Sequence, residues 1–174
     1  MDNKKWYKNP EMIVALSALM IGLVTAFTSI YSASVDRAYA RASVWPRLEM
    51  FRSYNEVSFF KYGVANNGTG PALIKMVKVK QGDKYLKRWS EIKQFSGINA
   101  TQSHISHRTL AAQDSITPIQ YKGKEVKKLL SIDNSISIEI CYCSIYEECW
   151  LIDRESIPEP IASCVIDKKE AFLQ

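Results

Sequence analysis

One stretch near the amino end constrains this chain more than any other part of it. From Met12 to Val35 the sequence contains no charged residue. A helix that crosses the hydrocarbon core of a bilayer needs about 20 apolar residues, and this segment meets that need. We therefore expect a single transmembrane helix over residues 12–33, preceded by a short flank over residues 1–11.

A cleavable signal peptide is the alternative explanation of this segment. Lys4, Lys5 and Lys8 would form its basic region, and Ala38-Tyr39-Ala40 has the form of a cleavage site. The apolar part of a signal peptide is usually about 7–15 residues long, and this one is longer. The length favours an uncleaved signal-anchor and leaves open whether Ala38-Tyr39-Ala40 is cut.

Small residues recur along one face of the expected span. Ala18, Gly22 and Ala26 are spaced by four, and such spacing lets two helix backbones approach closely in a membrane. The pattern predicts self-association through this face. Basic residues flank the span almost equally on both sides, so the positive-inside rule does not fix its orientation.

After the span, short apolar segments separated by turn residues predict a mainly β domain over residues 43–157. Alternation of apolar and polar residues is the main signal; in residues 56–66, for example, it places Phe60, Tyr62 and Val64 on one face. The strand count favours an antiparallel immunoglobulin-like β-sandwich, with a small barrel as the alternative. The expected strands cover residues 42–50, 56–66, 71–81, 104–110, 114–122, 134–145 and 149–153.

Two short helices are expected as inserts between strands, over residues 85–95 and 124–130. Pro118 predicts that its strand lies at a sheet edge, because proline lacks a backbone donor. Pro158 and Pro160 are expected to end regular structure, which would leave residues 158–174 as a loose C-terminal tail.

The glycine-rich sequence NNGTG, residues 66–70, poses a choice between a phosphate-binding loop and a turn. Leu73 stands where a dinucleotide-binding loop has its third glycine, and the Gly123-Lys124 pair leads to Glu125 rather than to Ser or Thr. We therefore predict a hairpin or a sheet-crossing turn in which Gly68 and Gly70 serve the backbone.

Three motifs give the chain a resemblance to known proteins. The sequences ASVWP, NNGTGPALIK and CYCSIYEECW resemble the ASVWP, NxGxGPALI and YCSxxxxCW motifs of a group of small, uncharacterised bacterial proteins. The resemblance implies a single-pass protein of the bacterial inner membrane with a β-rich domain. It brings no catalytic residues.

Cysteine chemistry depends on the turn of the last hairpin. If the turn is Ser144–Glu148, Cys143 faces Cys149 and a cross-strand disulfide is possible; a tighter turn pairs Cys149 with Ser144 instead. Free thiols that pack as small apolar residues remain the alternative. A disulfide would slightly favour a periplasmic domain, since such bonds persist in oxidising compartments.

Other chemistry finds little support in the sequence. A zinc site made by His104, His107, Cys141 and Cys143 has unfavourable spacing, and hydrolase motifs are lacking. The net charge of +5 is mild, and a solvated face or contact with anionic lipid explains it better than nucleic acid. The basic cluster comprises Lys75, Lys78, Lys80, Lys84, Lys87, Arg88 and Lys93.

These observations predict a non-enzymatic, membrane-anchored β domain that binds another protein or supports a membrane complex, with no catalytic, cofactor or metal residues. The alternatives are a membrane-bound thiol/redox protein that uses the Cys141-x-Cys143 hairpin, and an envelope sensor domain. A sensor would need a ligand pocket, which the sequence does not reveal.

The expected anchor can be tested by extraction. Because an apolar helix of this length is stable in the hydrocarbon core of a bilayer and costly to expose to water, we expect the full-length chain to stay in the membrane pellet after washing with alkaline carbonate. Its appearance in the aqueous supernatant would contradict the anchor.

Overall fold

The computed structural model describes residues 9–92 and 98–174, and the basic flank with Lys4, Lys5 and Lys8 lies outside them. The chain divides into two compact units, Met1–Ala42 and Ser43–Gln174. The first contains the long helix α1 (Pro10–Ser43). Among the described residues, α1 is the one helix long and apolar enough to cross a membrane.

Several hydroxyl side chains of helix α1 donate to carbonyls of the same helix. The hydroxyl of Ser17 donates to the carbonyl of Ile13 at 2.8 Å, and that of Thr25 donates to Ile21 at 2.7 Å. Such bonds remove the cost of placing a hydroxyl in hydrocarbon. The helix runs ten residues beyond the expected end at residue 33 and stops at Ser43. Pro46 follows shortly afterwards, and the residue before a proline disfavours the helical conformation.

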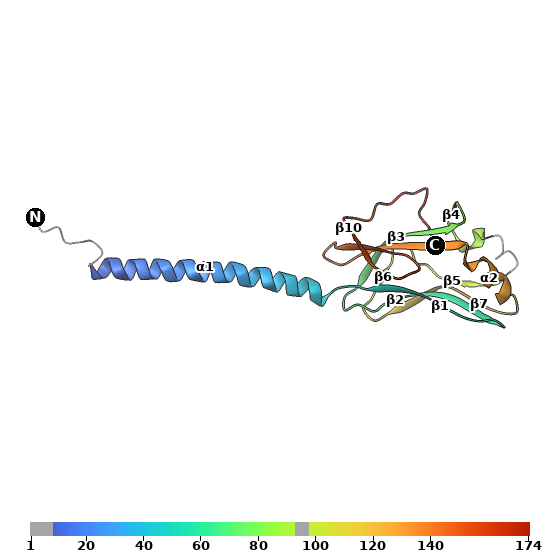
Figure 1. Ribbon diagram of the computed structural model, residues 1–174, viewed down its shortest axis with the longest axis horizontal. Coiled ribbons are helices and arrows are strands. Elements are labelled where there is room, and N and C mark those ends of the chain that lie inside the picture. The colour runs from blue at the N-terminus through green and yellow to red at the C-terminus, as the bar shows by residue number, and fades with distance from the viewer. Residues whose placement is uncertain (1–8, 93–97) are drawn as a thin grey trace, which may run out of the picture. The chain divides into compact units, whose positions relative to one another are not determined.

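The second unit is mainly β and contains two antiparallel sheets (Figure 1). One sheet has the strand order β1-β2-β7-β5, and the other has the order β10-β9-β8-β3-β4 with β6 paired to β3. The first sheet consists of β1 (Leu48–Asn55), β2 (Phe59–Asn66), β5 (Thr101–Gln102) and β7 (Ser115–Lys122). The second consists of β3 (Ala72–Gln81), β4 (Lys84–Leu86), β6 (Thr109–Leu110), β8 (Ile136–Cys143), β9 (Cys149–Ile152) and β10 (Glu159–Ile161).

Both sheets contribute to one hydrophobic core. Phe60, Tyr62 and Val64 of β2 are buried, as their alternation predicts, and they belong to the same cluster as Val77 and Val79 of β3. The predicted helix over residues 124–130 is confirmed as α2 (Val126–Asp133), which buries its apolar face.

The predicted helix over residues 85–95 is wrong in its described part. Residues 84–86 form β4, which pairs with the end of β3, and Gly82 at φ 58° makes the tight connection between them. Only Trp89–Glu91 are helical, as the 3₁₀ turn η2; residues 93–97 lie outside the described residues. The apolar spacing that suggested a helix instead places Trp89 and Ile92 in the core.

Three strand predictions differ from the structure. The strand predicted over residues 42–50 begins only at Leu48, because α1 continues to Ser43. Of the strand predicted over residues 104–110, only Thr109–Leu110 form β6. Strand β7 is not at an edge, because β2 pairs along one side and β5 along the other. Pro118 is tolerated there because the register with β2 shifts between Tyr62 and Val64, so the proline lies at an irregularity where no ladder donor is required.

The expectation of a loose tail over residues 158–174 is corrected by the structure. Pro160 lies within β10, which pairs with β9. Phe172 is fully buried, and its backbone N–H donates to the carbonyl of Val77 at 2.8 Å. The amine of Lys87 donates to the carbonyls of Lys168 and Ala171. The carboxyl end is therefore part of the folded domain.

The NNGTG segment is a sheet-crossing turn, as predicted, because it links β2 of one sheet to β3 of the other. It packs against the backbone of the segment that enters the domain: Thr69 N–H donates to the carbonyl of Trp45 at 2.9 Å. A Cβ atom at Gly68 or Gly70 would collide with backbone atoms of Trp45 and Val44. Both glycines are thus required by close approach.

Asn66, the first residue of this turn, is fully buried and uses both ends of its amide. Its oxygen accepts from the backbone N–H groups of Arg47 and Gly68, each at 3.1 Å. Its nitrogen donates to three backbone carbonyls, those of Gly70, Leu110 and Ala111. One side chain therefore joins the entry segment, the turn and the strand before β7.

Replacing Asn66 should test this role. We expect Asn66→Ala to lower the free energy of unfolding by about 3 kcal/mol, because it leaves several buried backbone groups without partners. Urea unfolding of the full-length protein in detergent micelles, followed by tryptophan fluorescence, measures the change. The matched control is Asn67→Ala: Asn67 is exposed, and its side chain donates to the side chain of exposed Glu49, so a loss of equal size there would contradict our interpretation.

Candidate functional site

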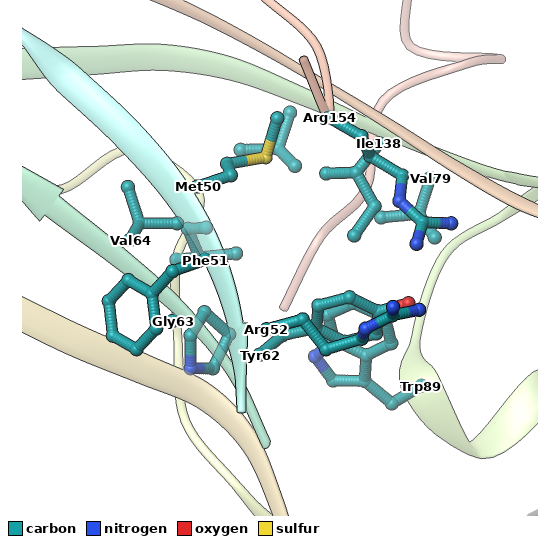
Figure 2. Close-up of a pocket in the computed structure, with 13 residues that line it drawn as sticks. Met50, Phe51, Arg52, Tyr62, Gly63, Val64, Val79, Trp89, Ile138 and Arg154 are labelled. Carbon is teal, nitrogen blue, oxygen red and sulfur yellow. The ribbon is translucent and has the colours of Figure 1, made fainter. Parts of the chain in front are cut away.

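A cavity of about 180 Å³ lies within the domain and is lined by residues of both sheets (Figure 2). Most of its wall is apolar, since β1, β2, β3 and β8 turn aliphatic side chains toward it. The aliphatic lining residues are Met50, Val64, Val77, Val79, Ile105 and Ile138.

Arg52 is a charged residue that lines this mostly apolar cavity, and the register of β1 places it there. Strand β1 pairs with β2 so that Met50 lies opposite Val64 and Arg52 lies opposite Tyr62. Alternate residues of a strand share a face, so Leu48, Met50 and Arg52 form one inward set. Arg52 therefore lies on the inward face of β1, and its side chain is 34% exposed.

A second arginine reaches the same cavity from the segment after β9, and one carboxylate holds both. Asp133, at the end of α2, is 1% exposed, and its Oδ2 contacts the guanidinium groups of Arg52 and Arg154. Arg154 also donates to the carbonyls of Asp133 and Ile136 at 2.6 and 2.7 Å. Burial lowers the pKa of Arg154 below its usual value. Two arginines share one carboxylate, so the cluster of Arg52, Arg154 and Asp133 has a net positive charge.

Tyr62 and Trp89 line the cavity, and each carries a buried donor that has no partner among the residues that the structure describes. These donors are the hydroxyl of Tyr62 and the indole N–H of Trp89. Their rings stack with centroids 6.5 Å apart, and the guanidinium of Arg154 lies 5.7 Å from the Tyr62 ring. A buried polar group without a partner costs about 1–3 kcal/mol. The cavity thus combines an apolar body with a polar end made of donors.

This site was not foreseen from the sequence. A signal was present in the pattern Leu48-x-Met50-x-Arg52, in which a charged residue occupies an inward position of a strand. Asp133, which contacts Arg52, lies 81 positions later in the sequence, so no local sequence pattern links the two residues.

The structure places all four cysteines in disulfides. Cys143 is joined to Cys149 across the β8–β9 hairpin, whose register pairs Tyr142 with Trp150. The hairpin therefore has the Ser144–Glu148 turn, not the tighter alternative. Cys141 is joined to Cys164, which the sequence did not suggest, because it fastens β8 to the C-terminal segment expected to be loose.

The sequence did not favour a zinc site, and two of the four residues considered for it are in disulfides. His104 and His107 are exposed, and the cysteines proposed beside them are bonded elsewhere. Within the basic cluster, Lys78 pairs with Glu170, and this hydrogen bond raises the pKa of Lys78. Two basic groups of the cluster, Lys78 and Lys87, therefore have partners within the domain.

The small-residue stripe of α1 lies on an exposed surface. Ala18, Gly22 and Ala26 are all exposed, and a Cβ atom added at Gly22 would meet nothing within 4 Å. Self-association through this face stays a prediction.

No protein-family model, no curated protein and no solved structure matches the chain.

The two disulfides should contribute unequally to stability. Cross-linking stabilises more when it closes a longer loop, and the sequence separations are 23 for Cys141–Cys164 and 6 for Cys143–Cys149. Loop entropy gives about 3 kcal/mol for the first and about 2 kcal/mol for the second. We expect the Cys141→Ala/Cys164→Ala variant to unfold at lower urea concentration than the Cys143→Ala/Cys149→Ala variant. The reverse order would show that loop closure does not dominate.

Proposed function

We propose that this protein is a non-enzymatic, membrane-anchored binding module that senses a small molecule in the cavity between its sheets. The cavity carries the proposal, because unpaired buried donors beside an apolar wall are expensive in an empty protein and useful in a liganded one. An envelope sensor domain is an alternative that the sequence allows. The sequence alone does not reveal the ligand pocket that a sensor needs.

Anchor and compartment form part of the proposal. Helix α1 is long and apolar enough to serve as a single-pass signal-anchor. Two disulfides favour an oxidising compartment, and we infer that the domain lies on the periplasmic side of a bacterial inner membrane. The resemblance of its three motifs to small membrane-anchored bacterial proteins supports the anchor, whereas the side of the membrane is inferred from the disulfides alone.

The finer fold assignment also belongs to the proposal. We infer an immunoglobulin-like sandwich, because the chain passes from one sheet to the other between β2 and β3 and again between β7 and β8. Such crossings are typical of sandwiches with Greek-key connections. A rigid domain of this kind, tethered beside a membrane, suits an accessory module that transmits ligand binding to a protein partner.

The thiol/redox alternative receives less support from the geometry. Every cysteine is already in a disulfide, and Cys141, Cys143 and Cys149 are buried. A reactive cysteine is expected to be accessible and to have a lowered pKa.

A thermal-shift measurement tests the proposed binding function. The full-length protein in lipid nanodiscs is mixed with toluene, cyclohexanol, phenylacetate or benzylamine. At least one should raise the unfolding temperature by about 4 °C when its concentration is about ten times its Kd, because binding to the native state alone stabilises it.

A cavity-filling variant supplies the control for this measurement. Val64 is buried and lines the cavity, so Val64→Phe should abolish the shift. Val57→Phe changes an exposed residue in the same way and should preserve it. The proposed function fails if no compound shifts the native protein, or if Val64→Phe responds like the native protein.

A further inference from the structure

The polar end of the cavity offers donors and positive charge to a ligand. Arg52 and Arg154 both line the cavity and both contact the single carboxylate of Asp133. Tyr62 and Trp89, whose hydroxyl and indole N–H have no partner among the described residues, line the same cavity. In Figure 2, Arg52, Tyr62 and Trp89 gather at one side of the cavity, and the guanidinium of Arg154 points to that side as well. The chemical complement of such a set is an anion with acceptor oxygens.

The donors differ in how far they are already committed. Arg154 bonds two backbone carbonyls in addition to Asp133. Arg52 contacts Asp133 through Nη1, and a guanidinium has five N–H donors. Arg52, the Tyr62 hydroxyl and the Trp89 N–H are therefore the groups best placed to receive an added anion.

Cavity size and lining define the rest of the ligand. Apart from these groups, the wall is made chiefly of aliphatic side chains, including Met50, Val64 and Ile138. A cavity of about 150 Å³ lined by apolar groups admits benzene, and this one measures about 180 Å³. The space suits a compact apolar body, roughly one ring in size, with its charge at one end.

We propose that the cavity binds a small carboxylic acid with a compact apolar body, whose carboxylate lies against Arg52, Tyr62 and Trp89. This inference rests on the proposed binding function and specifies its ligand class. A free compact acid is favoured over a long acyl chain, because the apolar part of the cavity is too small for an extended tail.

The test is calorimetric titration of the full-length protein in phosphatidylcholine nanodiscs. The probes are phenylacetate, the neutral benzyl alcohol, the cationic benzylamine and dodecanoate. Phenylacetate should bind at least tenfold more tightly than each of the other three, because a hydrogen bond to a charged group is worth more than a neutral one.

Tyr62→Phe is the informative variant, because it removes one hydroxyl and leaves the ring. It should weaken the affinity for phenylacetate at least tenfold and change the affinity for benzyl alcohol by less than twofold. Since the hydroxyl has no partner in the structure, the variant should unfold at a urea concentration no lower than the native protein. Arg52→Gln should likewise weaken phenylacetate by at least tenfold.

Tyr121→Phe is the matched control. Tyr121 is as buried as Tyr62, at 7% exposed, but lies outside the cavity lining, and its hydroxyl accepts a hydrogen bond from the N–H of Glu125 at 3.2 Å. This variant should lose stability and keep its affinity for phenylacetate.

The outcomes separate the two proposals. Preference for benzyl alcohol, benzylamine or dodecanoate, or unchanged phenylacetate affinity in Tyr62→Phe, overturns the acid assignment while the cavity remains a binding site. Absence of binding by all four probes overturns the ligand class and, together with a failed thermal-shift measurement, the binding function itself.

Discussion

The fold of the second unit depends on one buried amide. Asn66 is the point where the chain leaves one sheet for the other, and its side chain binds the backbone of three separate segments. Buried polar groups are costly unless they are satisfied. Because the amide bonds backbone atoms, it fixes how these segments lie regardless of their side chains. The adjacent glycines let the turn approach the entry segment closely enough for those bonds.

Regular alternation made most of the second unit predictable. The strands of residues 59–66, 72–81 and 136–143 follow from local patterns of apolar residues, and α2 follows from helical spacing. The predictions failed where distant contacts decide conformation. Residues 84–86 extend as a strand because they pair with β3, and Pro118 lies inside a sheet because the register of β2 shifts beside it.

The candidate site was beyond reach of the sequence for the same reason. Arg52, Tyr62, Trp89 and Arg154 come from four segments, and only the packing of the sheets brings them to one cavity. The pairing of Cys143 with Cys149 could be considered in advance, because a hairpin makes it local. Cys141 and Cys164 are joined only because the C-terminal segment folds back onto β8.

Strand β1 is an edge strand of its sheet, and the loop that contains Ser156 covers part of that edge. The Ser156 hydroxyl accepts from the N–H of Met50 at 2.8 Å and donates to its carbonyl at 3.1 Å. At the border of the other sheet, β10 is three residues long and contains Pro160. Free strand borders recruit other chains and seed aggregates. The Ser156 bonds and the short, proline-containing β10 both disfavour pairing of these edges with other chains. Copies of the domain at high local concentration are therefore protected from edge-to-edge association.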